Sequence, residues 1–214
     1  MTRRNRVDPW GDLHAVPERG LFTGNRGCLV DDGGRLKRHH NGSLWIVCHT
    51  EFEDFRQALD APRTWTPLFF LDDAVALAAG HRPCGFCRRN DYRSYRDGLT
   101  TAAALGRSLS ASELNHRLAE ERHRRGRGLD RAQDRILWTS DLANLPTGTV
   151  VLLPGSDKPH LLTRNHLQPF AFDGWGPPRD RPEDETVAVL TPPTSVAAMR
   201  NGFIAHLHPT AIDV

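Results

Sequence analysis

The placement of four cysteines constrains this chain more than any other feature of its sequence. Two of them form the compact motif Cys84-Gly-Phe-Cys87, while Cys28 and Cys48 lie far upstream. A Cys-x-x-Cys motif can wrap two thiolates and the intervening amides around one side of a tetrahedral zinc ion, and Gly85 permits the tight turn. We therefore expect one zinc site with Cys28, Cys48, Cys84 and Cys87 as its ligands.

Other readings of these cysteines stay open. A redox pair is one, although the strand-to-helix βαβ setting usual for such pairs is missing around Cys84, and buried inert thiols are another. His39, His40 or His81 could replace one thiolate, but a histidine beside a metal site more often lies behind the ligands or at the surface. Four cysteine ligands would leave no open coordination position, which disfavours hydrolysis by zinc-bound water.

The hydrophobic pattern of the first 90 residues mixes strand and helix signals. Strands are expected over 36–40 and 44–48, joined by a tight turn at Asn41-Gly42, and over 67–70. A short helix is expected around 53–59. Another is expected over 71–80, because Asp72 and Asp73 suit its N-terminal end and Gly80 can take the left-handed position that ends a helix.

The rest of the chain changes from helical to strand-rich. A helix is expected from Asp91 to about Leu105, and Ser110 with Glu113 forms a capping box that opens a second one. Short apolar runs in the last third predict a small antiparallel sheet or barrel, with a final helix over 194–200. The expected fold class is α+β, in three parts: a zinc module over 20–90, an Arg-rich helical connector over 91–135 and a β-rich domain over 136–214.

Charge is distributed unevenly along the chain. The net charge is only +2, but residues 136–214 hold 5 basic against 8 acidic residues, so the positive charge lies in the first 135. Nearly all of the basic residues are Arg, whose guanidinium binds phosphate bidentately. The DNA or RNA backbone is therefore an expected partner, and ordinary solvated charge is the alternative. The residues expected to contact phosphates are Arg82, Arg88, Arg89, Arg93, Arg124 and Arg125.

The sequence offers no membrane signal. It contains no run of about 18 apolar residues, and its first residues, Met-Thr-Arg-Arg-Asn-Arg, lack the apolar stretch of a signal peptide. We expect a cytoplasmic protein with no membrane partner. In that reducing compartment the cysteines would not form a disulfide framework.

One segment, Phe69–Arg89, resembles the second half of the amino-terminal zinc domain of the Ada family of DNA alkylation-repair proteins. A Phe-Phe strand, an Ala-rich helix and the run Gly-His-Arg-Pro-Cys-Gly-Phe-Cys-Arg follow one another as they do in that family. The resemblance implies that the module over 20–90 is Ada-like, that Cys84 and Cys87 bind zinc, and that Arg82, Arg88 and Arg89 could approach a phosphate backbone. The whole chain resembles a group of uncharacterised bacterial zinc proteins.

The first half of the chain departs from the Ada pattern. Ada domains place their first two zinc cysteines close together, and one of these accepts a methyl group from a DNA phosphotriester. Here 19 residues separate Cys28 from Cys48, and no Pro-Cys-His-Arg acceptor motif follows.

Three functions, and the question of enzymatic activity, therefore stay open. The first is contact with nucleic-acid phosphates, in a response to alkylation damage. The second is a zinc thiolate, Cys28 or Cys48, that accepts an alkyl group. The third is a structural zinc that supports a small-molecule or protein-binding domain, for which Trp45, Trp65 and the Asp31-Asp32 pair are the candidate pocket residues.

Overall fold

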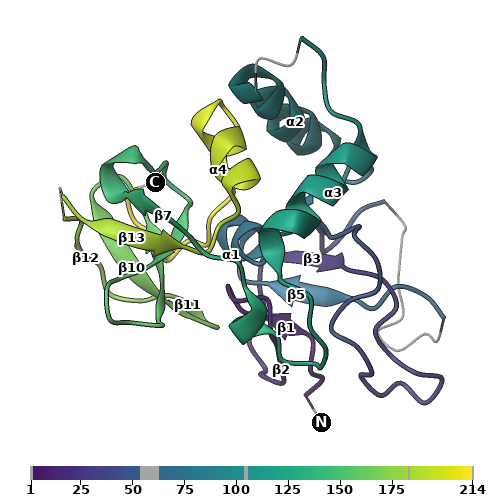
Figure 1. The fold of residues 1–214 in the computed structure, drawn as a ribbon. Helices are drawn as coiled ribbons and strands as arrows, with labels where there is room; N and C mark the ends of the chain where they lie inside the picture. Colours follow the sequence, from purple (N-terminus) through teal and green to yellow (C-terminus); the bar gives the residue numbers. More distant parts are fainter. Residues whose placement is uncertain (1, 54–62, 104–105, 183, 214) are drawn as a thin grey trace.

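The protein has an α+β fold built from two sheets and four α-helices among its described residues (Figure 1). The structure is a computed structural model that describes residues 2–53, 63–103, 106–182 and 184–213. The helix expected around 53–59 lies almost entirely outside the described residues. None of the helices in the described part of the chain combines the length and the apolar run that a bilayer crossing requires.

The first sheet is mixed and has the strand order β2-β1-β5-β3-β4-β6. Its strands are β1 (Arg6–Val7), β2 (Leu13–His14), β3 (Phe22–Asn25), β4 (Ile46–His49), β5 (Leu68–Phe70) and β6 (Arg82–Pro83). Strand β3 runs antiparallel to both β4 and β5, whereas β6 runs parallel to β4 with Pro83 opposite Val47. This register brings the end of β4 beside the segment that leaves β6.

The prediction of a hairpin between 36–40 and 44–48 is wrong. The strand at 46–49 exists, but its antiparallel partner is β3, and residues 37–40 form no strand. The preceding segment turns locally instead, because Asp31 Oδ1 accepts hydrogen bonds from the backbone N–H groups of Gly33 and Arg35. Gly24 allows β3 to pair closely with β4, since a Cβ at this position would lie 2.1 Å from the Ile46 carbonyl oxygen.

The second sheet confirms the expectation of a short-stranded antiparallel tail. Every strand pair in it is antiparallel, and the main order is β11-β10-β9-β8-β13-β7, with β12 paired to β10. Its strands are β7 (Trp138–Asp141), β8 (Val150–Leu152), β9 (Pro159–Leu162), β10 (His166–Ala171), β11 (Gly174–Trp175), β12 (Arg179–Asp180) and β13 (Thr186–Val189).

The helices form where their local signals predict them. They are α1 (Asp73–Ala78), α2 (Arg89–Ala103), α3 (Ala111–Arg122) and α4 (Pro193–Arg200), and two short 3₁₀ turns cover Ala132–Asp134 and Leu142–Asn144. The side chain of Asp72 caps α1 by accepting from Val75 N–H, and Gly80 ends it with a φ of 86°. The predicted capping box of Ser110 and Glu113 opens α3.

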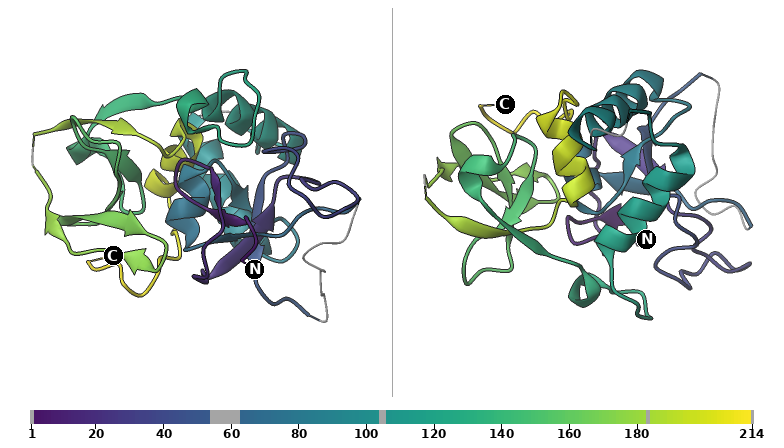
Figure 2. Two further views of the ribbon diagram at one scale, coloured as in Figure 1. Left: turned by 90° about the horizontal axis from the view of Figure 1, so that it is seen from below. Right: turned by 45° about the horizontal axis from the view of Figure 1, so that its top comes forward.

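Helix α1 lies between the two sheets, and all six of its residues are buried (Figure 1). Helix α4 lies between the second sheet and the pair α2 and α3, as both further views show (Figure 2). The two hydrophobic clusters therefore each combine side chains from the first 90 residues with side chains from beyond 136, such as Phe70 with Val150 and Leu77 with Val151. The first 90 residues and the part beyond 136 therefore share both clusters.

Candidate metal centre

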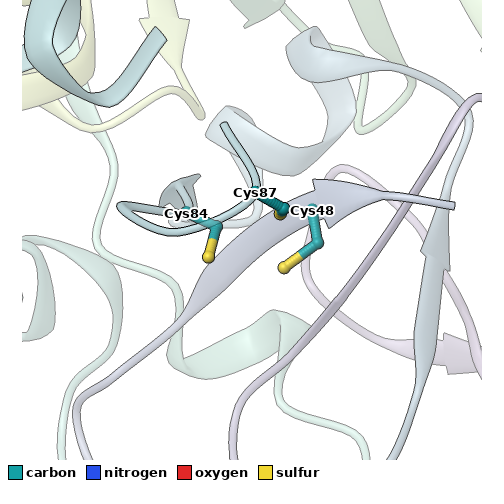
Figure 3. A group of neighbouring side chains, drawn as sticks. All are labelled: Cys48, Cys84 and Cys87. Carbon is teal, nitrogen blue, oxygen red and sulfur yellow. The ribbon is translucent and has the colours of Figure 1, made fainter. Parts of the chain in front are cut away.

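Three of the four cysteines meet at one edge of the first sheet. The sulfur atoms of Cys48, Cys84 and Cys87 all lie within 4.8 Å of one another (Figure 3). Cys48 belongs to β4, and the other two lie in the turn between β6 and α2. The parallel pairing of β4 with β6 creates this proximity, because Cys84 N–H donates to the Val47 carbonyl at 2.9 Å.

Backbone hydrogen bonds shape the turn that carries Cys84 and Cys87. The Arg88 N–H donates to the Cys84 carbonyl at 3.1 Å, and the Phe86 N–H points to the Cys84 sulfur at 3.4 Å. The backbone N–H of His49 points to the Cys87 sulfur. The N–H groups of Phe86 and His49 stabilise negative charge on sulfur, as a metal-binding thiolate requires.

The three thiols also perturb one another. Hydrogen bonding to the Cys84 and Cys87 sulfurs raises the pKa of Cys48, and burial raises it further. The same contact with Cys48, together with Cys87, lowers the pKa of Cys84. Closely packed thiols that share protons in this way are a ready ligand set for a cation that favours thiolates.

A buried ion pair anchors the cysteine turn to α1. Arg88 follows Cys87 directly and donates from both terminal nitrogens to the Asp73 carboxylate, at 2.5 and 2.7 Å, while its Nε donates to Asp91 at 2.8 Å. Its guanidinium also lies 4.2 Å from the centre of the Phe22 ring. Burial lowers the pKa of Arg88, but the hydrogen bonds and charge of Asp73 more than reverse that effect and raise it.

Two of the six arginines expected to contact phosphates are used inside the protein instead. Arg88 is buried in the ion pair just described. Arg82 is buried as well, donating to Asn115 Oδ1 at 2.9 Å and to the Pro83 carbonyl at 3.0 Å. These partners could not be predicted from the sequence, because Asn115 lies 33 residues from Arg82. The other four, Arg89, Arg93, Arg124 and Arg125, are exposed.

Cys28 and the candidate histidines lie apart from the three sulfurs. Thr23 of β3 lies opposite Cys48, and Cys28 lies five residues beyond Thr23 along the chain. The Cys28 sulfur lies 3.6 Å from the Val30 carbonyl oxygen. His39, His40 and His81 instead surround Trp45, with ring centres 5.6, 5.3 and 5.0 Å from it. Among the described residues, the group of close metal-ligand atoms contains only the three cysteines.

A cavity of about 310 Å³ opens beside the three cysteines. Aromatic side chains supply much of its wall, and its polar side chains are neutral or imidazole; no Asp or Glu is found among its described lining residues. It is lined by Thr23, Asn25, Ile46, Cys48, His49, Thr50, Phe52, Trp65, Pro67, Phe69, Cys84, Phe86 and Cys87. Trp65 was a candidate from the sequence, but Phe52 and Phe86 were not, although their rings meet edge to face at 5.2 Å.

Comparison with known proteins identifies no relative of this chain. No protein-family description matches it, and neither the curated proteins nor the solved structures contain a match.

Proposed function

We propose that this protein binds one zinc ion through Cys48, Cys84 and Cys87 and that the fourth coordination position faces the aromatic cavity. The supporting observation is that all three clustered sulfurs belong to residues lining that cavity. Tetrahedral zinc with Zn–S bonds of about 2.3 Å holds its sulfurs about 3.8 Å apart. The cluster, with sulfurs within 4.8 Å, needs only a small contraction to reach that geometry.

The donor set favours a reactive thiolate over hydrolysis. Bound zinc would keep the cysteine sulfurs deprotonated at neutral pH. Hydrolysis would also need a general base, and the described cavity wall offers one imidazole, that of His49, and no carboxylate for that role. Three thiolates around a divalent ion leave a net negative charge, which favours attack by sulfur on an alkyl carbon.

Cys48 is the sulfur best suited to act as nucleophile. Backbone N–H groups point to the other two sulfurs, from Phe86 to Cys84 and from His49 to Cys87, and such hydrogen bonds reduce nucleophilicity. In the proposed step the Cys48 sulfur forms a bond to the alkyl carbon of an ester held in the cavity. The carbon–oxygen bond breaks, and the leaving oxygen takes the electron pair as an oxyanion.

Metal content of single variants tests the ligand set. Purified protein should contain about one zinc per chain, and Cys48→Ser, Cys84→Ser and Cys87→Ser should each lose most of it. Cys28→Ser is the matched control and should retain it. Metal-free wild-type protein after purification with zinc present would contradict the proposal, as would an equal loss in Cys28→Ser.

Mass spectrometry after exposure to a methyl phosphotriester tests the chemistry separately. One methyl group on Cys48, absent when zinc is removed by a chelator, is the expected result. Zinc-loaded protein with no methylated cysteine would reduce the centre to a structural role, while methylation of Cys28 alone would contradict the assignment of the nucleophile.

Contact with a nucleic-acid backbone is a second candidate function, favoured by the exposure of Arg89 and Arg93 on α2 directly after the cysteine turn. Binding to duplex DNA should weaken steeply with salt. The double variant Arg89→Gln/Arg93→Gln should lower the slope of that dependence by about one for each lost phosphate contact. Arg179→Gln, an exposed arginine on β12, is the control, and equal slopes in all three proteins would exclude a role for α2.

A further inference from the structure

A second cavity, of about 400 Å³, opens beside the C-terminal end of α3. Four arginines and two histidines line it, and its described wall contains no Asp or Glu. These six residues are Arg122, Arg124, Arg125, Arg131, His40 and His123. Two of the arginines, Arg124 and Arg125, are exposed, whereas Arg122 and Arg131 are only 3% and 4% exposed. The cavity thus has a basic rim and a basic interior.

Among the described residues no carboxylate forms an ion pair with the buried Arg122, although the Glu121 carboxylate favours its charged form from a distance. Its two terminal nitrogens donate to the carbonyl oxygens of Gly80 and Ser43, each at 3.1 Å. Its guanidinium lies 3.9 Å from the centre of the Trp45 ring. Gly80 follows the C-terminal end of α1, and the partial charge there, about half an elementary charge at most, offsets only part of the guanidinium charge.

Two more guanidiniums lie buried near Arg122 with the same kind of partners. Arg26 donates to the Gly11 carbonyl at 2.8 Å and contacts His39. Arg135 donates to the carbonyls of Arg122, Ala78 and Leu190. The Nε atoms of Arg26 and Arg135 have no hydrogen-bond partner. Burial, followed by mutual repulsion, lowers the pKa of Arg122 to about 9. Arg26 and Arg135 are also lowered in pKa, to about 9 and about 10, chiefly by burial. All three remain charged at neutral pH.

The nearby acidic groups already have partners. Asp134 pairs with Arg131 of the cavity wall, Glu121 pairs with Arg117, and Asp8 pairs with His14. Asp12 accepts hydrogen bonds from the backbone N–H groups of Arg131 and Ala132, and it lies 3.8 Å from His39. The carboxylates of Asp12 and Asp8 do favour the charged form of Arg26, but neither lines the cavity.

His123 gives the cavity wall an unused polar atom. Its Nε2 is buried and has no hydrogen-bond partner. Burial, and then the charges of neighbouring arginines, lower the pKa of His123. The same two causes lower the pKa of His40 to about 4. Both imidazoles are therefore neutral at pH 7. The Nδ1 of His40 already contacts the Nδ1 of His39 at 3.1 Å, whereas the Nε2 of His123 is available for a hydrogen bond.

We propose that this cavity binds the phosphate group of a small molecule. A doubly charged phosphate would supply a negative partner for Arg122, Arg124 and Arg125 and a hydrogen-bond partner for His123, and guanidinium groups form paired hydrogen bonds to phosphate oxygens. The volume falls within the range of small-ligand sites. Two of the four cavity arginines, Arg122 and Arg131, are nearly inaccessible from the surface, so the site suits a compact phosphate better than the continuous backbone of a duplex.

Titration calorimetry with inorganic phosphate and with pyrophosphate tests the proposal, using sodium acetate at matched ionic strength as the control anion. Saturable binding of phosphate or pyrophosphate, absent with acetate, is expected. Arg125→Gln and His123→Gln should each weaken it about tenfold, which corresponds to the loss of one charge-assisted hydrogen bond of about 1.4 kcal/mol. Arg179→Gln should leave it unchanged, because Arg179 lies outside this cavity.

Nuclear magnetic resonance gives a readout that does not depend on substitution. Phosphate should raise the pKa of His123 and His40, because an adjacent anion favours the imidazolium form. Failure of both phosphate and pyrophosphate to bind would overturn the proposal, as would binding that Arg125→Gln and His123→Gln leave intact. Binding of duplex DNA that needs Arg124 and Arg125, without binding of either small anion, would assign the surface to nucleic acid instead.

Discussion

The ion pair between Arg88 and Asp73 joins the cysteine turn to the helix between the sheets, and both side chains are fully buried. Asp73→Asn removes the charge and keeps the shape. Loss of one partner from a buried pair costs about 3 to 5 kcal/mol, because the remaining charge is left uncompensated. Asp91, whose side chain is 24% exposed, still accepts from Arg88 Nε, so the expected cost lies at the low end, about 3 kcal/mol.

Urea unfolding of zinc-loaded protein measures this cost. With an m-value of about 2 kcal/mol/M, the loss of about 3 kcal/mol moves the midpoint down by about 1.5 M. Asp91→Asn should lower the midpoint less, since that carboxylate is partly exposed to solvent. Arg107→Gln, which breaks the exposed pair with Glu113, should leave the midpoint near that of wild type.

Two results would refute this reasoning. A loss of less than about 1 kcal/mol in the free energy of unfolding for Asp73→Asn would mean that the ion pair is not buried away from water. A larger loss for Asp91→Asn than for Asp73→Asn would mean that the exposed partner, and not α1, holds the turn.

Two further perturbations probe the core around the site. His81 is fully buried, both its ring nitrogens lack partners, and burial lowers its pKa. The folded protein therefore favours the neutral imidazole. Stability should be fully present above the unfolded pKa of about 6.5 and should be lost as the pH falls below that value. His81→Leu should narrow the difference in urea midpoint between pH 5 and pH 8, and an unchanged difference would contradict the burial of a neutral imidazole. Gly24→Ala should cost more than about 3 kcal/mol in thermal or urea unfolding, because the new Cβ would collide with the Ile46 backbone. Gly33→Ala, whose Cβ would meet only side chains at 3.3 Å or more, is its control, and equal stability of the two variants would show that β3 and β4 are not paired in this register.

Features decided within a few residues could be predicted from the sequence. The acidic start and glycine end of α1, the capping box of α3 and the apolar runs of the second sheet all correspond to elements in the structure. For the two helices the deciding contacts, such as Asp72 with Val75 N–H, join residues close in the chain. Local chemistry therefore identified the elements.

Features decided by distant partners could not be predicted. The partner of β4 depends on Gly24, which allows close approach to Ile46, and on the local turn at Asp31 that diverts the expected strand. Arg88 looked like a surface cation, because nothing in the sequence shows that Asp73, 15 residues earlier, faces it. Counting cysteines suggested a four-sulfur set, whereas the pairing of β3 with β4 carries Cys28 away from Cys48.

X-ray absorption at the zinc edge tests the three-cysteine centre most directly. The expected spectrum of the zinc-loaded protein shows three sulfur atoms at about 2.3 Å and one oxygen or nitrogen at about 2.0 Å. Cys28→Ser should give the same spectrum, while Cys48→Ser should retain too little zinc to give it. Four sulfur neighbours in the wild-type protein, with one lost in Cys28→Ser, would contradict the open position beside the cavity.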